Sequence, residues 1–517
     1  MENACPCYCM LCPKLPILIP IKRIEGMIFM ESIWRKQTKH IAPKASDKPS
    51  FTTHYDIIVI GAGLAGLLTA YYLQTQGQSV LVLEADEIAS GQTERTTAKI
   101  TSQHGLKYNK LIQTIGFKKA KLYAQANQAA IQEYENLIQD QHIHCQFIRV
   151  PAYLYTTREE TPLRKEAEAA SSLGINAFFT TETELPFQVT GAVCFPEQAQ
   201  FSPLEFIRHI ASELEILEHT QVMGVKGNQV ITNDKVFTGD KIVAATHYPF
   251  RDVPGFYFLR QHQERSYVLA LAACSKINGM YYGIDKDALS LRQAGDVLLL
   301  GGGSHRTGEN ESGGAYDFLS QAAKKYFPDC REEARWSAQD CMPHDGIPFI
   351  GRYAIFTPHL YVITGFQKWG MTTAMIAAMI LRDELQGIPN PYSKLFTPQR
   401  CNLRAGIGNL LTDVGMSVKG LVKGWFHRPG TGADALAPGH GGIVAIDGKR
   451  YACYKEETGK LHKISARCPH MGCELTWNPD EKSWDCPCHG SRFDADGKLL
   501  DNPAKKESST KSEDTPL

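Results

Sequence analysis

The alternation of apolar and polar residues changes abruptly near residue 55. Residues 56–60 form an almost unbroken apolar run, which predicts a buried strand of a parallel sheet. A glycine-rich turn, a helix from Leu64 to about Gln76 and a strand from Ser79 to Leu83 follow, so the segment predicts a βαβ unit. Residues 1–52 show no clean period and are predicted to be a disordered leader.

The middle of the chain mixes helical and strand periods. Apolar residues recur at helical spacing over 118–139 and 159–172, whereas runs at 266–273 and 296–300 predict antiparallel strands. A strand from Leu360 to Thr364 precedes a long apolar helix. These elements predict an α/β fold in which a Rossmann-like domain carries a second domain built on an antiparallel sheet.

The C-terminal part begins with a connector and ends in short strands. Apolar residues between 407 and 425 fall at spacings of three and four, on one face of a helix. Two interpretations of this helix stand: docking on the preceding domain, which we favour, and peripheral attachment to a membrane surface. Strands at 443–446, 450–454 and 461–465 predict a small all-β domain, and residues 506–517 are predicted to be a disordered tail.

Composition limits the classes of function. A chain of 517 residues predicts two or three domains, and 55 basic residues balance 55 acidic ones, so we expect no nucleic-acid partner. No apolar run reaches the roughly 18 residues of a transmembrane helix. We therefore expect a soluble, cytoplasmic protein.

The 15 cysteines fall into three groups. Four lie within residues 5–12, where a soft-metal site and an untidy leader are the alternatives; we favour the leader, or a true start at Met27 or Met30. Four lie within 468–488. The other seven are scattered singly, as expected of buried thiols in a reducing compartment.

The glycine-rich turn has the form of a dinucleotide-binding loop. Gly61, Gly63 and Gly66 follow a strand and open a helix, and Glu84 ends the next strand. The glycines allow a tight turn and close approach to a pyrophosphate, the helix N-terminus offers N–H donors, and Glu84 can accept from ribose hydroxyls. This order of parts predicts a nucleotide site.

Four later segments resemble the FAD-dependent amine and D-amino acid oxidase superfamily, which includes glycine and sarcosine oxidases. They are residues 90–99, 195–204 and 240–246, and the run 336–351 that leads through a strand to 365–372. The resemblance covers about residues 55–395 and implies that the start of the last helix approaches the flavin. The residues expected to bind FAD are Gly61, Ala62, Gly63, Gly66, Glu84, Thr93, Thr97, Gly365, Gly370, Met371 and Thr372.

A second nucleotide site for NAD(P)H is not expected. The nearest candidate, residues 300–306, puts Arg306 at the third glycine position and lacks an apolar helix behind it. His305 and Arg306 could contact an anionic substrate, but a polar turn at the end of a strand is the favoured interpretation.

Two short motifs near the C-terminus carry the most specific chemistry. Cys468 and His470 lie in one motif, and Cys486 and His489 in the other, so each loop offers one thiolate and one imidazole. Such a set suits a Rieske-type [2Fe–2S] cluster, in which neutral His ligands raise the potential to roughly −150 to +300 mV. A tetrahedral zinc site is the alternative, and it would leave Cys473, Cys488 and Ser491 without a role.

The motifs resemble the Rieske proteins of cytochrome bc complexes over about residues 437–505. That resemblance implies a disulfide between Cys473 and Cys488, and a hydrogen bond from Ser491 to a cluster sulfur. Phe493 stands where those proteins usually have a tyrosine, so we predict a lower potential. Asn502 replaces the expected glycine of the loop that covers the cluster, which leaves the shape of that loop open.

Together these features predict an oxidoreductase of five segments: a leader (1–52), an FAD-dependent oxidoreductase body (53–395), a linker with an amphipathic helix (396–436), a Rieske domain (437–505) and a tail (506–517). A small substrate, such as an amine or amino acid, would reduce FAD, and the cluster would pass single electrons to an external protein, quinone or oxygen. The alternatives are a cluster that feeds the flavin, and an oxidase with a structural or redox-sensing cluster. No catalytic base is visible in the sequence.

Overall fold

The predicted βαβ unit opens a mixed sheet in the computed structural model, which describes residues 31–38, 41, 53–400, 402, 406, 415, 430–432 and 436–509. β1 (His54–Ile60) pairs in parallel with β2 (Val80–Leu83) on one side and β10 (Val236–Ala244) on the other. The strand order is β16-β17-β10-β1-β2-β7, and β9 and β8 extend from β10. The other bounds are β7 (Glu215–Leu217), β8 (Val222–Lys226), β9 (Gln229–Thr232), β16 (Phe349–Arg352) and β17 (Leu360–Thr364).

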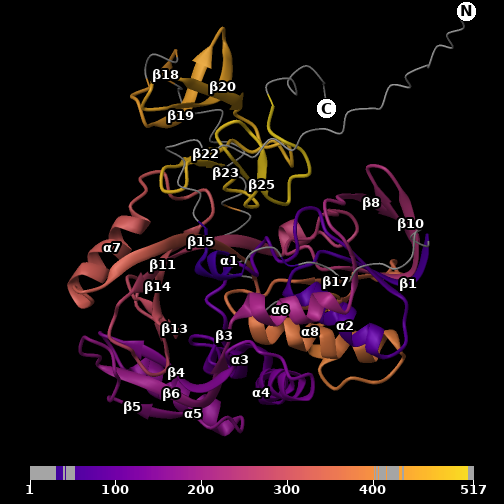
Figure 1. The fold of residues 1–517 in the computed structure, drawn as a ribbon, viewed down its shortest axis with the longest axis vertical. Coiled ribbons are helices and arrows are strands. Elements are labelled where there is room, and N and C mark those ends of the chain that lie inside the picture. Colours follow the sequence, from indigo (N-terminus) through magenta and orange to yellow (C-terminus); the bar gives the residue numbers. More distant parts are fainter. Residues whose placement is uncertain are drawn as a thin grey trace, which may run out of the picture. The chain divides into compact units, whose positions relative to one another are not determined.

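The central strands of this first sheet are buried because they are apolar on both faces. All four residues of β2 and all five of β17 are buried. Three helices pack together beside it, α2 (Leu64–Thr75), α6 (Pro203–Ser212) and α8 (Gly370–Leu385) (Figure 1). The apolar run that follows Trp369 is therefore a core helix, as its length predicts.

The second sheet is largely antiparallel and confirms the predicted second domain. Its order is β15-β11-β14-β13-β12-β4-β6-β3, with β5 on β6. β11 (Gln261–Ala272) lies between β15 (Arg331–Pro343) and β14 (Val297–Arg306), and the three are antiparallel. The other strands are β3 (Lys99–Ile100), β4 (Ile148–Thr156), β5 (Phe178–Thr180), β6 (Gly191–Gln200), β12 (Met280–Gly283) and β13 (Ser290–Ala294).

Helices connect and flank the two sheets. α4 and α5 confirm the helices predicted from spacing. The helices not yet given are α3 (Tyr108–Ile115), α4 (Phe117–Asp140), α5 (Thr161–Ser172), α7 (Ala315–Tyr326), α9 (Ser393–Phe396) and the 3-10 helix η1 (Tyr257–Leu259).

The C-terminal domain consists of two four-stranded sheets. The first has the order β18-β19-β20-β21 and the second β22-β23-β24-β25. A core with Trp484 and Phe493 fully buried and Tyr454 stacked on Trp477 joins them. The bounds are β18 (Gly430–Thr431), β19 (Gly441–Ile446), β20 (Lys449–Lys455), β21 (Leu461–Ser465), β22 (Thr476–Asn478), β23 (Ser483–Asp485), β24 (Arg492–Phe493) and β25 (Leu499–Asp501).

The structure corrects two predictions of disorder. Within the leader, α1 (Ile33–Gln37) is ordered, because Trp34 is 3% exposed and donates from Nε1 to the carbonyl oxygen of Thr96 at 2.7 Å. In the tail, Ser508 is buried and its backbone N–H donates to the Gly497 carbonyl oxygen. The predicted linker helix over 407–425 and the cysteines at 5–12 lie outside the described residues, apart from Gly415.

The structure also corrects two predictions on polar and thiol groups. His305 and Arg306 belong to β14, not to a turn, because β14 continues pairing with β11 to Arg306. Cys274 and Cys330 are not single thiols but form a disulfide, because pairing of β11 with β15 brings the ends of these strands together.

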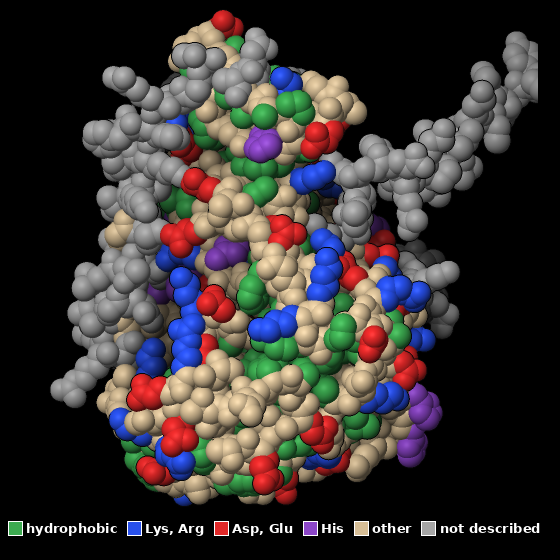
Figure 2. Space-filling model, turned by 90° about the vertical axis from the view of Figure 1, so that its left-hand side faces the viewer, with side chains coloured by type: hydrophobic (Ala, Val, Ile, Leu, Met, Phe, Trp, Pro, Cys, Tyr) green, Lys and Arg blue, Asp and Glu red, His purple; other side chains and the backbone are tan. Residues whose placement is uncertain are grey.

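Helix hydropathy and surface charge indicate how the protein could meet a membrane or a polyanion. Among the described residues, no helix is both long and apolar enough to cross a membrane. Figure 2 shows one face of the molecule, on which acidic and basic side chains are interspersed. Such a surface gives a polyanion no extended basic patch on this face.

Candidate functional site

The glycine loop joins β1 to α2 and is closed by the end of β2. The backbone N–H of Ala62 donates to Glu84 Oε2 at 2.7 Å, and burial raises the pKa of the Glu84 carboxyl. A Cβ at Gly66 would lie 2.0 Å from the Gly61 carbonyl oxygen, so only glycine lets α2 pack this close to the loop. The loop thus has the tight turn and the helix N-terminus that a pyrophosphate-binding loop needs.

The predicted hydroxyl-rich loop lies against the start of α2. Thr93 Oγ1 accepts from the backbone N–H of Leu64 at 2.9 Å, and Thr93 is buried. Thr97 lies farther along, and its carbonyl oxygen accepts from Arg292. The structure therefore brings Thr93 to the glycine loop, whereas Thr97 faces the second sheet.

The segment 365–372 links β17 to α8. Gly365 has φ +76°, a conformation that favours glycine, and α8 begins at Gly370 as predicted. Trp369 stacks on His104 with ring centroids 4.7 Å apart, and Tyr134 donates from its hydroxyl to the Met371 carbonyl oxygen at 2.9 Å. The N-terminus of α8 is thus held by packing, and its N–H groups can stabilise negative charge.

A group of charged side chains near this segment was missed by the sequence analysis. Lys368 Nζ lies 3.4 Å from Glu264 Oε2 on β11 and 2.7 Å from Ser304 Oγ on β14. Glu264 is the cross-strand partner of Asp340 on β15. Each residue is separated from the others by dozens of positions. The register of β11 with β15 pairs Glu264 with Asp340, and the segment after β17 brings Lys368 to them.

Two carboxyl groups in this cluster have opposite pKa shifts. Burial raises the pKa of Asp340 to about 7. Burial would raise that of Glu264 as well, but the hydrogen bond from His262 and the charge of Lys368 lower it to about 2. Neighbouring carboxyls with separated pKa values are suited to distinct roles, one as a fixed charge and one as a proton acceptor near neutral pH.

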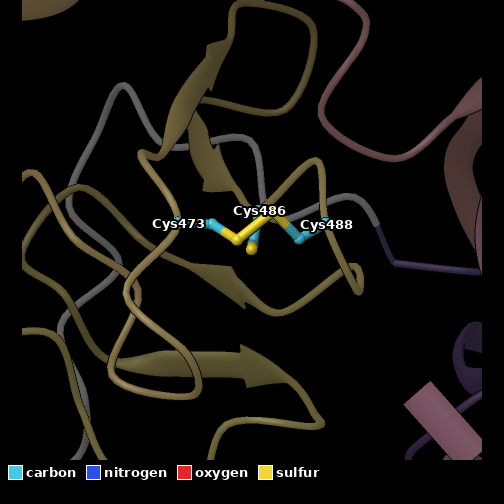
Figure 3. A group of neighbouring side chains, drawn as sticks. All are labelled: Cys473, Cys486 and Cys488. Atoms are coloured by element: carbon cyan, nitrogen blue, oxygen red, sulfur yellow. A yellow bond between two sulfur atoms is a disulfide. The ribbon is translucent and has the colours of Figure 1, made fainter. Parts of the chain in front are cut away.

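The two C-terminal motifs form two loops that face each other. The first follows β21 and is closed by a hydrogen bond from the Cys468 N–H to the Cys473 carbonyl oxygen at 2.8 Å. The second follows β23 and is closed by one from the Cys486 N–H to the Ser491 carbonyl oxygen at 2.8 Å. A disulfide between Cys473 and Cys488, with an S–S distance of 2.04 Å, joins the loops, as the resemblance implies (Figure 3).

The four expected ligands lie on these loops, where the two thiols contact each other and the two imidazole rings contact each other. Cys468 and Cys486 are buried free thiols, and the His470 and His489 rings have centroids 5.0 Å apart at 88°. Nδ1 of His470 is buried and makes no hydrogen bond to any of the described residues. A buried nitrogen without a hydrogen-bond partner, in a loop that also carries a free thiol, fits a metal centre.

The two thiols form a coupled pair. The hydrogen bond with Cys486 lowers the pKa of Cys468 most strongly, whereas the same hydrogen bond together with burial raises the pKa of Cys486. The sulfurs of Cys473, Cys486 and Cys488 also lie within 4.8 Å of one another. Because two of these sulfurs form the disulfide, that trio cannot supply three thiolates, and the mixed Cys and His set fits better.

The loop with Cys486 and His489 rests on the second sheet of the body. Gln263 Nε2 donates to the His489 carbonyl oxygen at 2.7 Å and to that of Asn502 at 3.0 Å. Gln339 Nε2 donates to the Gly490 carbonyl oxygen at 2.8 Å. A Cβ at Gly490 would lie 2.8 Å from the Gln263 side chain, so glycine permits this contact.

The contacts of Asn502 explain why this position is not the glycine that the resemblance predicts. Its Nδ2 donates to the carbonyl oxygens of Thr246 at 3.0 Å and Tyr248 at 3.1 Å, both just beyond β10. The loop that covers the cluster is therefore also an attachment to the body. A glycine could not make these hydrogen bonds.

Buried ion pairs reinforce the attachment. Arg265 of β11 is 1% exposed, and its guanidinium lies 2.7 Å from Glu481 Oε2 and 3.5 Å from Asp501 Oδ2. Arg492 pairs with the same two carboxylates from within the C-terminal domain, and with Asp485. The C-terminal domain is thus docked through charges that water does not screen.

Comparison with protein families assigns both halves of the chain. Residues 56–384 match the family described as FAD dependent oxidoreductase, and residues 432–512 match the Rieske [2Fe-2S] domain. YhfW, a Rieske 2Fe-2S iron-sulfur protein of Bacillus subtilis, is 35% identical over 498 residues, which is 92% of this chain and 96% of YhfW. A cytochrome b6-f complex iron-sulfur subunit of Cyanophora paradoxa is 33% identical over 120 residues, 23% of this chain and 47% of its own length.

Solved structures share the fold of the body. Glycine oxidase from Geobacillus kaustophilus has a TM-score of 0.58 at 18% identity and covers 68% of this chain and 100% of its own. L-proline dehydrogenase from P. horikoshii has a TM-score of 0.57 at 17% identity and covers 68% and 98%. The body binds FAD and the C-terminal domain a [2Fe–2S] cluster. This chain therefore belongs to the FAD dependent oxidoreductase family and carries a C-terminal Rieske domain.

Proposed function

We propose that the protein is a dehydrogenase of amines or amino acids that passes electrons singly through its Rieske domain to an external acceptor. When bound, FAD accepts a hydride from the carbon next to nitrogen, and the cluster carries one electron at a time. Docking of the cluster loops on the body is the observation that supports this relay. Proximity in one chain removes the need for a diffusing carrier between the two centres.

The proposed cluster ligands are Cys468, His470, Cys486 and His489. A chain of contacts leads from them to the body: Gln263 donates to the His489 carbonyl oxygen, and Cys341 Sγ lies 3.9 Å from Gln263 Oε1 and 3.4 Å from His247 Nε2. His247 follows β10, at the carboxyl edge of the parallel sheet. Cofactors in such folds bind at that edge.

The proposed substrate class rests on the charged side chains of Glu264, Asp340 and Lys368 and on the solved structures that share the fold of the body, which are called its structural neighbours below. Those neighbours are named as acting on glycine and proline, which are amino acids. Glu264 and Lys368 would fix the orientation of substrate charges, and Asp340 would take a proton from the substrate ammonium so that a neutral amine is presented. The cytoplasm remains the proposed location, although the Cys274–Cys330 disulfide gives it no support.

The test is an anaerobic screen of amines and amino acids against the holoprotein, with flavin bleaching and cluster reduction followed by stopped-flow absorbance. We expect one class of amine to bleach the flavin first and reduce the cluster second. An Asp340→Asn variant should bleach slowly with that amine, and Asp296→Asn, at a 92% exposed side chain, should bleach at the normal rate. Flavin bleaching without later cluster reduction would refute the relay, and equal rates in both variants would refute the role of Asp340.

A further inference from the structure

The outer nitrogen of one cluster histidine is held by the flavoprotein body. His470 Nε2 lies 3.0 Å from Asp252 Oδ1, and the two residues are 218 positions apart in the chain. The His470 side chain is 5% exposed and that of Asp252 is 37% exposed. Nδ1 of the same ring is buried and has no hydrogen-bond partner among the described residues, so it is the nitrogen available to the cluster while Nε2 is held by the body.

Asp252 belongs to a body segment that contacts both histidines. The segment consists of the loop from β10 to η1 and of η1 itself, whose Phe258 packs edge-on against the His489 ring with centroids 5.7 Å apart. At its other end, the His247 carbonyl oxygen accepts from Thr364 Oγ1 at 2.6 Å. One segment thus connects the carboxyl edge of the flavin sheet to the histidine side of the cluster.

The contact has an electronic consequence. A histidine that binds a metal through one nitrogen commonly donates its other N–H to a carboxylate, which orients the ring and makes it a stronger donor. A stronger donor and a nearby negative charge both favour the oxidised cluster over the reduced one, which carries one more electron. Asp252 therefore lowers the tendency of the cluster to accept an electron.

We propose that Asp252 is a positioning residue for the cluster: it fixes His470 from the body and sets the reduction potential below that of the undocked domain. The proposal goes beyond the relay, because it holds whichever substrate or acceptor the protein uses. It also makes the potential depend on docking, since Asp252 is not part of the Rieske domain. The histidine side is closed by the body, so an external acceptor has to approach the cluster elsewhere.

The test is a redox titration of the holoprotein, with the reduced cluster followed by electron paramagnetic resonance. Asp252→Asn keeps an oxygen acceptor for His470 but removes the charge. We expect the ratio of reduced to oxidised cluster at a fixed potential to rise about tenfold, which is about 59 mV for a one-electron couple. Asp252→Glu retains the charge and should return the potential toward the wild-type value.

The matched control is Asp480→Asn. Asp480 also accepts hydrogen bonds across the domain boundary, from Asn310 at 2.8 Å and from the backbone N–H of Ala315 at 3.0 Å, and these partners are not cluster ligands. The cluster potential of the Asp480→Asn variant should match that of the wild type. An unchanged or lower potential in Asp252→Asn, or an equal rise in the control, would overturn the proposal. Asp252 is partly exposed, so the variants are expected to fold; iron, sulfide and flavin content confirm loading.

Discussion

Replacing Arg265 by Met is predicted to loosen the Rieske domain from the body. Met has a similar length and no charge, so the change removes ion pairs while filling much of the space. At an effective dielectric constant of about 20, charges 2.7 and 3.5 Å apart attract by about 6 and about 5 kcal/mol before the desolvation cost is subtracted. Breaking a buried pair from one side costs about 3–5 kcal/mol net.

The lost stabilisation of the docked domain can be measured as more frequent local opening of the segment that carries Glu481 and Asp501. Of the two arginines, only Arg492 would then pair with Glu481 and Asp501, so their segment should exchange amide hydrogens faster. The expected increase in the opening equilibrium is a factor of roughly 10² to 10⁴, at 1.4 kcal/mol per factor of ten. Hydrogen–deuterium exchange of peptides from 481–503 provides the assay.

A more exposed ion pair of the body provides the control. Arg149 pairs with Glu135 at 2.6 Å, but its side chain is 32% exposed, so Arg149→Met should cost at most about 1 kcal/mol. Charge neutralisation of Glu481 by Gln in the Arg265→Met background should recover part of the loss, because it removes a carboxylate left short of partners. If Arg265→Met exchanges no faster than Arg149→Met, the ion pairs do not hold the domain.

Three further predictions follow from the site. Phe493→Tyr should raise the cluster potential in a redox titration, because the phenol can add a hydrogen bond to the cluster; an unchanged or lower value refutes this. The rate of flavin bleaching should rise with pH through about 7 as Asp340 loses its proton, and Asp340→Asn should abolish that rise. Attraction to Arg265 and Arg492 outweighs burial and lowers the pKa of Glu481 and Asp501. Docking is therefore strong above the unfolded pKa values of about 4 and weakens as pH falls through the folded ones. An opening equilibrium, obtained from exchange relative to the unfolded peptide at each pH, that stays constant down to pH 3 contradicts this.

The sequence predicts the parts of the site that lie close together in the chain. The glycine loop with Glu84 and the pairs Cys468 with His470 and Cys486 with His489 each fall within one strand–loop unit, so their spacing alone indicates their chemistry. The beginning of α8 at Gly370 could be predicted for the same reason.

The missed residues depend on distant pairing. Asp252 and His470 are 218 positions apart, and Asp340 reaches Glu264 only through the register of β11 with β15. In the sequence, Arg265 has the pattern of an ordinary exposed polar residue of a strand, because the C-terminal domain that buries it is distant in the chain. Short helix α1 was missed because five residues give no period, whereas burial of Trp34 against the body fixes it.

The most direct test of the account is whether the two centres exchange electrons within one chain. Flavin in the holoprotein can be reduced by light with a sacrificial donor, without knowledge of the substrate, and the cluster followed by visible circular dichroism. We expect cluster reduction at a rate that does not change when the protein is diluted. A cluster that stays oxidised, or a rate that falls in proportion to protein concentration, would contradict it.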